Sequence, residues 1–543
     1  MANRIAVTIA GAVSLGAFEA GVLFEVLDAI GQHNLASPED SRLYVDVLTG
    51  ASAGGMTAAI AAQKLLYSAG ELAKPYDNVF YNAWVAGVDI NGLLPLGPGE
   101  SPSQSVLSSN FVRNLAEKLL LARYAELPVP SPSPHPALPL GGALRVGLAL
   151  SNLNGVDFQR QLLSGGAFNY TEFADQITFT LDHMTDAEAA WAPVIDAALA
   201  CGAFPFAFRP GDLSRDIKDF DPTFLAPWPR SPRVFTYTDG GVFQNQPIGL
   251  AKNLVDLIDK HQNSDTRSYL FVSPQGVDAK VSGITEATAS FELMAGALFN
   301  AVYNQAGFRD WIEAESVNQA ISLLNERAIQ LRSLFLSGAI ESSSIQGVVS
   351  MLLSQFRLKA EDLAKARNQL RAQFDSEYRE LASTNGAPAA DVWIDAVLLF
   401  ELAADLHEKD EMYIYSITTD RKDLAGAGFS SFLGFLERAF RDHDYDLGRE
   451  KAIAFLKNVK DMSQGKLPEL QYSPQEPIRP VEPTPAGGFT AEMIPEESRK
   501  RLVDALSAAA DNLLEQEKVS WVIRKSLESL YLNRKIKDAL DLG

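Results

Sequence analysis

The chain has 543 residues, of which 47% are hydrophobic and 9% aromatic, a composition that provides for a packed core and, at this length, for about two to four domains. Its 68 acidic and 47 basic residues give a formal net charge of −21, which opposes binding to nucleic acid and does not attract an anionic membrane. The single cysteine, Cys201, excludes an internal disulfide, and no apolar run reaches the length of a transmembrane helix.

The first predicted element is a central strand over residues 4–10, which is apolar and rich in β-branched residues. A glycine-containing loop over residues 11–16 follows it and leads into a predicted helix over residues 17–31. Such a loop can present backbone N–H groups to an oxyanion or a phosphate. The G-x-G-x-x-G pattern of dinucleotide sites is not met, because Val13 occupies the position of its second glycine. The loop therefore favours an oxyanion over a nucleotide.

The second strand–turn–helix unit contains Gly50-Ala51-Ser52-Ala53-Gly54, a G-x-S-x-G motif. A predicted strand over residues 43–48 precedes it, and a predicted helix over residues 56–66 follows. A serine in this setting is typical of a nucleophile elbow, in which a strained turn holds the hydroxyl clear of the sheet. The motif alone is also compatible with an ordinary turn that contains a serine.

Strands and helices continue to alternate up to about residue 275. We expect strands over residues 144–150, 176–181, 233–238 and 268–272, a turn at 151–155, and helices over 111–124, 191–199 and 250–259. This alternation predicts an α/β domain with a mainly parallel sheet. The loops at residues 11–16, 50–54 and 239–241 would then meet at the carboxyl edge of the sheet, where sites in such folds gather.

Asp239-Gly240-Gly241 follows the predicted strand over residues 233–238. A carboxylate within hydrogen-bond reach of Ser52 can take its proton if burial raises the pKa of the carboxyl group. An Asp-Gly pair is also a common turn, but its position beside the other two loops favours Asp239 as the catalytic base.

Histidine is the usual base for a serine nucleophile, so a Ser-His-Asp site is the alternative. The chain has six histidines: His33, His135, His183, His261, His407 and His443. His183 follows a predicted strand and is the best candidate among them. No cluster has metal-ligand spacing, and we expect neither a metal nor an organic cofactor.

The pattern changes to long helices after about residue 282, for example over residues 313–335 and 358–382. A strand over residues 412–418 is expected to join the first sheet, and a helix is expected over 496–542. We therefore predict a catalytic domain over residues 1–280 and a mostly helical extension or cap over residues 281–543.

The G-x-S-x-G at Ser52 and the D-G-G at Asp239 together resemble the patatin-like phospholipases. The later stretch from Ala425 to Arg449 resembles the C-terminal extensions of larger bacterial members. The loop at residues 11–16 resembles the family's glycine-rich oxyanion loop, and its continuation Gly16-Ala17-Phe18-Glu19-Ala20-Gly21-Val22-Leu23 is also similar to the family. Two departures stand out: Ala12 and Val13 occupy positions of the family's glycine triplet, and Leu15 stands where many members carry arginine.

The resemblance implies a three-layer α/β/α fold with a mainly parallel central sheet and a Ser/Asp dyad without histidine. Ser52 would be the nucleophile and Asp239 the base. The remaining site residues implied are Gly11, Ala12 and Val13 in the oxyanion hole, with Gly16, Gly50, Gly54, Gly240 and Gly241 as motif support. Apart from the resemblance, the proline-bearing loop with Phe204, Phe206 and Phe208 is compatible both with lining an acyl-chain pocket and with plugging the core.

The expected function is that of a serine acyl hydrolase, a lipase or esterase of phospholipase A type, which cleaves carboxylic esters of acyl lipids through an acyl-enzyme. The expected partners are an acyl lipid or ester and a peripheral membrane contact, without nucleic acid or a transmembrane segment. The expected location is the cytoplasm or a membrane periphery, and secretion without a cleavable signal stays open. A non-catalytic lipid-binding or scaffold protein with a degenerate patatin site is an alternative that the two departures support.

Overall fold

The computed structural model describes residues 3–516, except for residues 68–73, 123–133, 140–142, 162–165, 183–186, 221–224, 227–231, 260–266, 275–284, 287–290, 357, 405–411, 428–430, 464 and 481–490. Its contacts group the chain into two compact units. The first consists of Met1–Val255, Thr266–Asp310 and Ile414–Gly543, and the second of Asp256–Asp265 and Trp311–Tyr413. The domain boundary expected at residue 280 stays a prediction.

The first unit is built on an eight-stranded mixed sheet with the order β5-β6-β3-β2-β1-β7-β8, in which β4 pairs with β3 outside this path. The strands are β1 (Asn3–Ile9), β2 (Leu43–Gly50), β3 (Leu144–Gln161), β4 (Ala167–Leu181), β5 (Gly211–Arg215), β6 (Arg233–Asp239), β7 (Arg267–Val272) and β8 (Ile414–Ile417). Neighbouring strands from β3 to β8 along this order are parallel, whereas β4 and β6 pair antiparallel with β3, and β5 with β6. The predicted mainly parallel sheet is confirmed.

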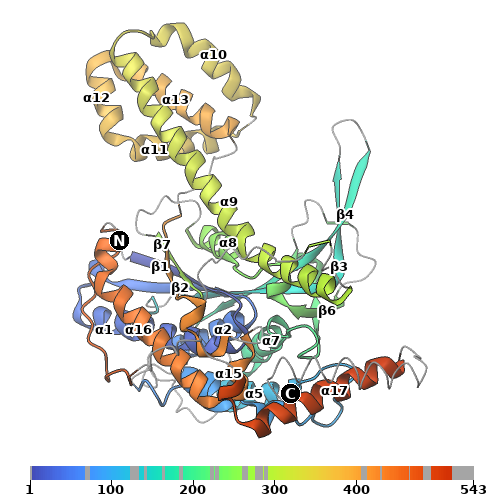
Figure 1. Cartoon of the computed structure of the whole chain (residues 1–543). Helices are drawn as coiled ribbons and strands as arrows, with labels where there is room; N and C mark the ends of the chain where they lie inside the picture. The colour runs from blue at the N-terminus through green and yellow to red at the C-terminus, as the bar shows by residue number, and fades with distance from the viewer. Residues whose placement is uncertain are drawn as a thin grey trace. The chain divides into compact units, whose positions relative to one another are not determined.

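Helices cover both faces of this sheet, with α1, α2 and α7 on one face and α8 on the other (Figure 1). The helices of the first unit are α1 (Gly16–Ala36), α2 (Ala53–Tyr67), α3 (Val79–Tyr81), α4 (Ile90–Leu93), α5 (Ser109–Glu117), α7 (Ala187–Cys201), α8 (Ile248–Asp259), α15 (Leu433–Leu436), α16 (Arg438–Met462) and α17 (Glu496–Gln516). Two π-helical segments, η4 (Asn82–Gly87) and η5 (Lys118–Ala122), continue α3 and α5. The arrangement is the expected α/β/α layering.

A cluster of three charged side chains joins β1, β2 and β7 near the strand ends that lie away from the glycine loops. The carboxylate of Asp46, on β2, accepts hydrogen bonds from Arg267 at 2.5 and 3.1 Å and from Arg4 at 2.7 Å. The register of β1 against β2 shifts between Ile5 and Ala6, so that Asp46 has no opposite residue. An acidic residue is tolerated in this otherwise apolar strand because both arginines pair with it.

The crossing of α1 and α16 depends on two glycines. A Cβ on Gly21 would lie 2.1 Å from the carbonyl oxygen of Tyr445, and a Cβ on Gly448 would lie 2.1 Å from that of Phe18. Nearby, the buried Arg449 donates to Glu25 at 2.7 Å. Because side chains are absent at the contact, the two backbones approach directly, and α16 becomes part of the first unit's core.

The second unit is a helical bundle with its own core. Its elements are the later part of α9 (Phe291–Leu336), α10 (Ser342–Gln355), α11 (Ala360–Gln373), α12 (Asp375–Asn385) and α13 (Ala387–Ala403). The fully buried Trp393 donates its indole N–H to the carbonyl of Ala328 at 2.9 Å and packs edge-to-face on Phe374. A bidentate pair between Arg367 and Asp395, at 2.6 and 2.9 Å, joins α11 to α13.

Two sequence predictions are wrong in detail. The turn expected at residues 151–155 is part of β3, because the chain absorbs the extra residues in a register shift, with Gly155 at φ 71°, and continues as a long hairpin with β4. The single helix expected over residues 358–382 is broken at Phe374, whose ψ of 39° ends α11. The ring of Phe374 is instead used to cover Trp393.

The glycine crossing generates a stability prediction. Replacement Gly448→Ala should lower the free energy of unfolding by about 1–3 kcal/mol, because its methyl group would overlap the Phe18 carbonyl and force the helices apart. The thermal midpoint, followed by circular dichroism, measures this effect. The matched control is Gly307→Ala in α9, where a Cβ would meet only Gln246, at an ordinary 3.6 Å. A Gly448→Ala midpoint at or above that of the wild type would contradict the close crossing.

Candidate active site

The turn between β2 and α2 has the shape of a nucleophile elbow. Ser52 lies in the left-handed region, with φ 52°. A Cβ on Gly50 would lie 2.4 Å from the carbonyl carbon of Gly54, and a Cβ on Gly54 would lie 2.3 Å from the carbonyl oxygen of Ala10. Only glycine fits at these two positions, and the strain at Ser52 is of the kind found at functional sites.

Ser52 and Asp239 meet although 187 residues separate them. Ser52 Oγ donates a hydrogen bond to Asp239 Oδ2 at 2.5 Å, and the N–H of Gly241 donates to Oδ1 at 2.7 Å. Both side chains are buried, with Ser52 2% exposed and Asp239 0%. The geometry is that of a hydroxyl paired with a carboxyl group that can take its proton.

β6 is not one of the parallel strands of the mainly parallel sheet. β6 runs antiparallel to β3, with Asp239 opposite Leu150, while Leu148 of β3 pairs with Gly50 of β2. β3 continues beyond the carboxyl end of β2, and β6 pairs with this continuation. β6 therefore begins beyond the carboxyl edge of the parallel strands and ends at that edge. Asp239 therefore reaches the carboxyl end of β2 from the opposite direction.

Burial sets the protonation of Asp239. Desolvation raises the pKa of its carboxyl group to about 7, against the lowering effect of the hydrogen bonds from Ser52 and Gly241. A base with a pKa near neutrality matches the requirement of general-base catalysis at physiological pH.

The residues at and just after the end of α7 contact both members of the Ser52–Asp239 pair or their neighbours. The Ala203 carbonyl accepts the N–H of Asp239 at 3.0 Å and the hydroxyl of Thr238 at 2.8 Å. Cys201 packs against the elbow, and a Cβ on Gly55 would lie 2.4 Å from its Sγ. Burial and the nearby Asp239 raise the pKa of the Cys201 thiol well above its ordinary value, so that it remains protonated.

The loop at residues 11–13 lies against Ser52. A Cβ on Gly11 would lie 3.0 Å from Ser52 Cβ and 2.0 Å from Asn245 Oδ1, so only glycine fits there. The N–H of Gly11 donates to the Asn245 carbonyl at 3.0 Å and is not available to an oxyanion. Within the described chain, the N–H groups of Ala12 and Val13 make no hydrogen bond. Of the three residues expected to donate to an oxyanion, these two therefore keep an N–H group that can do so.

Val13 carries backbone strain. Its φ of 53° places a β-branched residue in the left-handed region, which such residues rarely adopt. Strain of this kind persists only where the surroundings hold the backbone.

Sequence reasoning missed two groups at the elbow. The N–H of Ala53, which directly follows Ser52, makes no hydrogen bond in the part of the chain that the structure describes. The G-x-S-x-G pattern carried this signal, because the residue after the nucleophile supplies an oxyanion donor in such elbows. The other is Asn245, whose buried Oδ1 lacks a partner beside Gly11.

The other motif glycines have packing roles. A Cβ on Gly16 would lie 2.7 Å from the Trp84 ring, and a Cβ on Gly240 would lie 2.0 Å from the Ala149 carbonyl oxygen. They allow α1 to start beside Trp84 and the chain after Asp239 to cross β3 closely.

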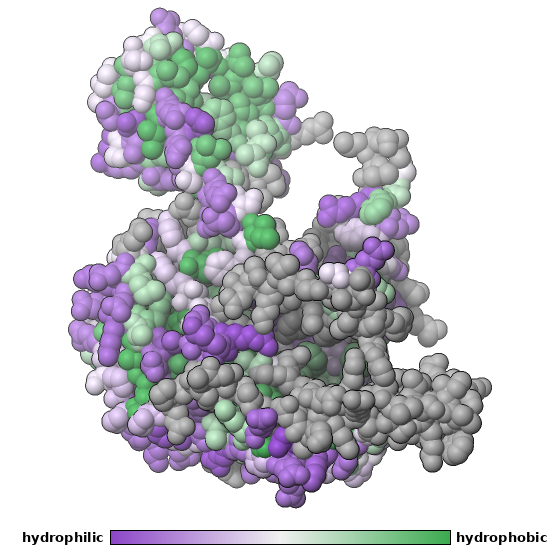
Figure 2. Space-filling model, viewed as in Figure 1, coloured by the Kyte–Doolittle hydropathy of each residue, from purple (hydrophilic) through white to green (hydrophobic). Residues whose placement is uncertain are grey.

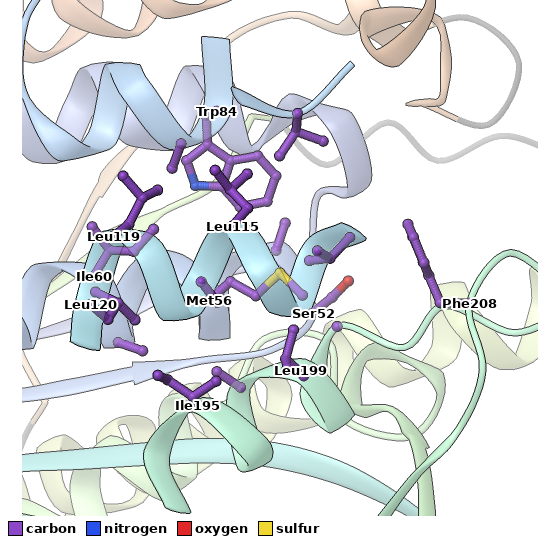
Figure 3. A pocket seen from close by; sticks show the side chains of 18 of the residues that line it. Ser52, Met56, Ile60, Trp84, Leu115, Leu119, Leu120, Ile195, Leu199 and Phe208 are labelled. Atoms are coloured by element: carbon purple, nitrogen blue, oxygen red, sulfur yellow. The ribbon is translucent and has the colours of Figure 1, made fainter. Parts of the chain in front are cut away.

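An apolar cavity of about 90 Å³ opens beside Ser52. Its walls come from α2, η4, α5, η5 and α7, as Figure 3 shows for the labelled side chains. Phe204 and Phe208 line it, whereas Phe206 is 82% exposed. The lining set is Val13, Ser52, Ala53, Met56, Ala59, Ile60, Ala83, Trp84, Val88, Val112, Leu115, Ala116, Leu119, Leu120, Ile195, Ala198, Leu199, Gly202, Phe204, Phe208 and Phe435.

Comparison with known proteins identifies a similarity to one family. Residues 7–252 match the family model described as patatin-like phospholipase. Over these residues the chain is similar to that family. The family implies a hydrolase, and the fold and motif order described above agree with it.

A relative extends the similarity beyond the patatin-like part. The chain is 24% identical over 509 residues to the uncharacterized protein y4iI of Sinorhizobium fredii (strain NBRC 101917 / NGR234). The alignment covers 83% of this chain, more than the patatin match alone, and 64% of the relative. The alignment thus spans less than two thirds of the relative's length.

The histidine alternative finds no support among the described histidines. His33 bonds the Ser41 carbonyl, His443 lies beside Asp444, and burial lowers the pKa of His135 to about 4. None of these three bonds Ser52 or Asp239. His183, the candidate for a triad, lies outside the described residues, as do His261 and His407.

Metal and membrane features are also limited to the described residues. In those ranges, no group of three or more His, Cys, Asp or Glu side chains could hold a metal ion. Over the same ranges, the structure contains no helix with the length and apolarity needed to cross a bilayer.

The raised pKa of Asp239 generates a pH prediction for the patatin-like site. If Asp239 acts as the base, kcat/KM for an ester should rise with pH and level off above about 7, because only the deprotonated carboxylate can take the Ser52 proton. The measurement is the pH dependence of carboxylic acid release from a short-chain ester. A midpoint near the ordinary carboxyl pKa of 3.8 would show that burial does not control the base.

Proposed function

We propose that the patatin-like part of the chain is a serine acyl hydrolase of lipase or phospholipase A type, which cleaves carboxylic esters of acyl lipids. The observation that carries this proposal is the 2.5 Å hydrogen bond from Ser52 to the buried Asp239 at the mouth of an apolar cavity. The family match supports lipid ester hydrolysis over other uses of a Ser/Asp pair.

The proposed reaction begins with attack of Ser52 Oγ on the ester carbonyl carbon, while Asp239 Oδ2 takes the hydroxyl proton. The N–H groups of Ala12, Val13 and Ala53 would donate to the carbonyl oxygen as it becomes an oxyanion. Collapse of the tetrahedral intermediate breaks the ester C–O bond, and the alcohol leaves with the proton from Asp239. Asp239 then deprotonates a water molecule, which attacks the acyl-enzyme carbonyl. As the bond between the acyl carbon and Ser52 Oγ breaks, Asp239 returns this proton to Ser52 Oγ and the fatty acid is released. No cofactor enters these steps.

The cavity supports an acyl chain as the part of the substrate that is bound. Ser52, which directly precedes α2, lines the cavity together with Met56 and Ile60, which lie one turn apart along that helix. From Ser52 to Ile60 the axial rise is about 12 Å. In Figure 3, Met56 lies between Ser52 and the far end, where Ile60, Leu119 and Leu120 gather. A chain extended from the acylated serine would pass Met56 first and Ile60 last.

The first test removes each member of the pair. Ser52→Ala and Asp239→Asn should each lower kcat for a p-nitrophenyl ester by about 10³-fold or more, because the nucleophile and its base act as a unit. Ser52→Ala should also lose labelling by a fluorophosphonate probe. The control is Ser463→Ala, which replaces an equally buried serine at the end of α16.

Each alternative has its own outcome in this test. Activity that survives Asp239→Asn but is lost in His183→Ala would favour a Ser-His-Asp esterase. A wild type that neither hydrolyses esters nor reacts with the probe would favour a non-catalytic lipid-binding or scaffold protein.

The second test concerns acyl-chain length. Ile60→Trp should spare short p-nitrophenyl esters and reduce kcat/KM for long ones by about 10- to 100-fold, since each methylene excluded from the cavity forfeits about 0.8 kcal/mol. Met56→Trp, one turn nearer Ser52, should move the cut-off to shorter chains. The control is Leu257→Trp on the exposed side of α8. An identical chain-length profile in all variants would rule out this cavity as the acyl site.

A further inference from the structure

The proposed oxyanion loop is gripped by a segment more than 400 residues away in the sequence. Its 3₁₀ turn, η1 (Val13–Leu15), is followed directly by α1. Ser14 Oγ donates to the Ser431 carbonyl. A Cβ on Gly434 would lie 2.6 Å from Ser14 Oγ, and a Cβ on Gly426 would lie 3.2 Å from the same atom. We name residues 424–427 and 431–436 the Ser14 clamp.

Two side chains of α16 hold the clamp by its backbone. The carboxylate of Asp444 accepts the N–H groups of Ala425 and Gly426 at 2.7 and 2.9 Å. Arg441, one turn earlier, donates to the carbonyls of Gly434 at 2.7 Å and Phe435 at 3.3 Å. Both side chains are at most 2% exposed, so these hydrogen bonds are made away from water, where they are strongest.

Burying these two charges is costly unless each finds partners. Desolvation lowers the pKa of Arg441 to about 10, and desolvation raises the pKa of Asp444, although His443 and the clamp N–H groups act in the opposite direction. The compensating contacts go mainly to the clamp backbone, with Arg441 also donating to the Val85 carbonyl at 3.0 Å. The burial of Arg441 and Asp444 is therefore compensated only while the clamp backbone stays in hydrogen-bond reach of both side chains.

The helix that holds the clamp, α16, packs on α1, the helix that directly follows the loop. α16 crosses α1 at Gly21 and Gly448 without intervening side chains. Because α1 directly follows η1, the loop, the clamp and α16 form a closed set of contacts. The clamp also reaches the cavity, since Phe435 lines it and Phe432 packs edge-to-face on Phe204.

The loop has a specific need for such support. A glycine at position 13 would adopt the left-handed conformation without strain, whereas the β-branched Val13 adopts it only under strain. The neighbouring Ser14 is the residue that the clamp encloses.

We infer that the Ser14 clamp, with Arg441 and Asp444 as positioning residues, holds the N–H groups of Ala12 and Val13 where an oxyanion would form. The catalytic part of this inference rests on the proposed ester hydrolysis. The clamp extends the site to residues 424–444, outside the residues 7–252 that match the patatin-like family.

The test compares two clamp variants with a matched control on the same helix, all in the full chain. Asp444→Asn places an amide against two N–H donors, and Gly434→Ala drives a methyl group into Ser14. Each should lower kcat for a short p-nitrophenyl ester by about 10- to 100-fold, since loss of one oxyanion donor costs about 10²- to 10³-fold, and should leave KM within about twofold. The control, Asp446→Asn, removes a buried carboxylate that pairs with Tyr76 and Arg479 instead, and should keep the wild-type kcat.

Two readouts separate positioning from folding. The split between a lowered kcat and an unchanged KM is the first readout, and hydrogen exchange of the loop is the second. Amide hydrogen exchange over residues 10–16 should be faster in Asp444→Asn and Gly434→Ala than in Asp446→Asn.

The outcomes distinguish failure of the clamp from failure of the proposed function. Wild-type kcat and unchanged exchange in both clamp variants would overturn the clamp. Faster exchange in a protein that shows no Ser52-dependent hydrolysis would support the clamp and reject the proposed function. Equal loss of kcat in Asp446→Asn would assign the effect to stability and overturn the inference.

Discussion

The candidate active site depends on one contact, the buried hydrogen bond between Ser52 and Asp239. A hydroxyl on a strained turn and a carboxyl from a distant strand must meet away from water, and neighbouring backbone must come close to both. This requirement explains the concentration of glycines at the site, because Gly11, Gly54 and Gly240 each stand where a methyl group would overlap backbone or a polar side chain. The same burial gives the carboxyl group a pKa of about 7.

The site is assembled from both ends of the chain. The residues that match the patatin-like family contain the elbow, Asp239 and the loop at residues 11–13, yet the loop is enclosed by residues from the clamp.

The space-filling view shows hydrophilic residues over much of the described surface of the first unit (Figure 2). The second unit has exposed apolar side chains of its own, among them Val348 and Met351 on α10.

The sequence predicted well the features that local patterns determine. The glycine spacing around Ser52 and the alternation of strands and helices are short-range signals, and the structure contains the corresponding turn and sheet. It could not predict the direction of β6, because that follows from the length of β3 beyond the sheet edge. Nor could it predict that the N–H of Gly11 donates to the Asn245 carbonyl, or that the N–H of Gly426 donates to Asp444. These hydrogen bonds join residues that only the folded chain brings together.

The position of β8 and α16 late in the sequence has a consequence for synthesis. β7 remains a sheet edge until β8 arrives, and α1 lacks its glycine-matched neighbour until residue 448 has left the ribosome. A nascent chain that already carries Ser52 and Asp239 therefore has an unsupported η1 turn, and the intervening helical bundle, with a core of its own, can fold first. The order of translation thus delays completion of the surroundings of Ser52 until β8 and α16 have been synthesised.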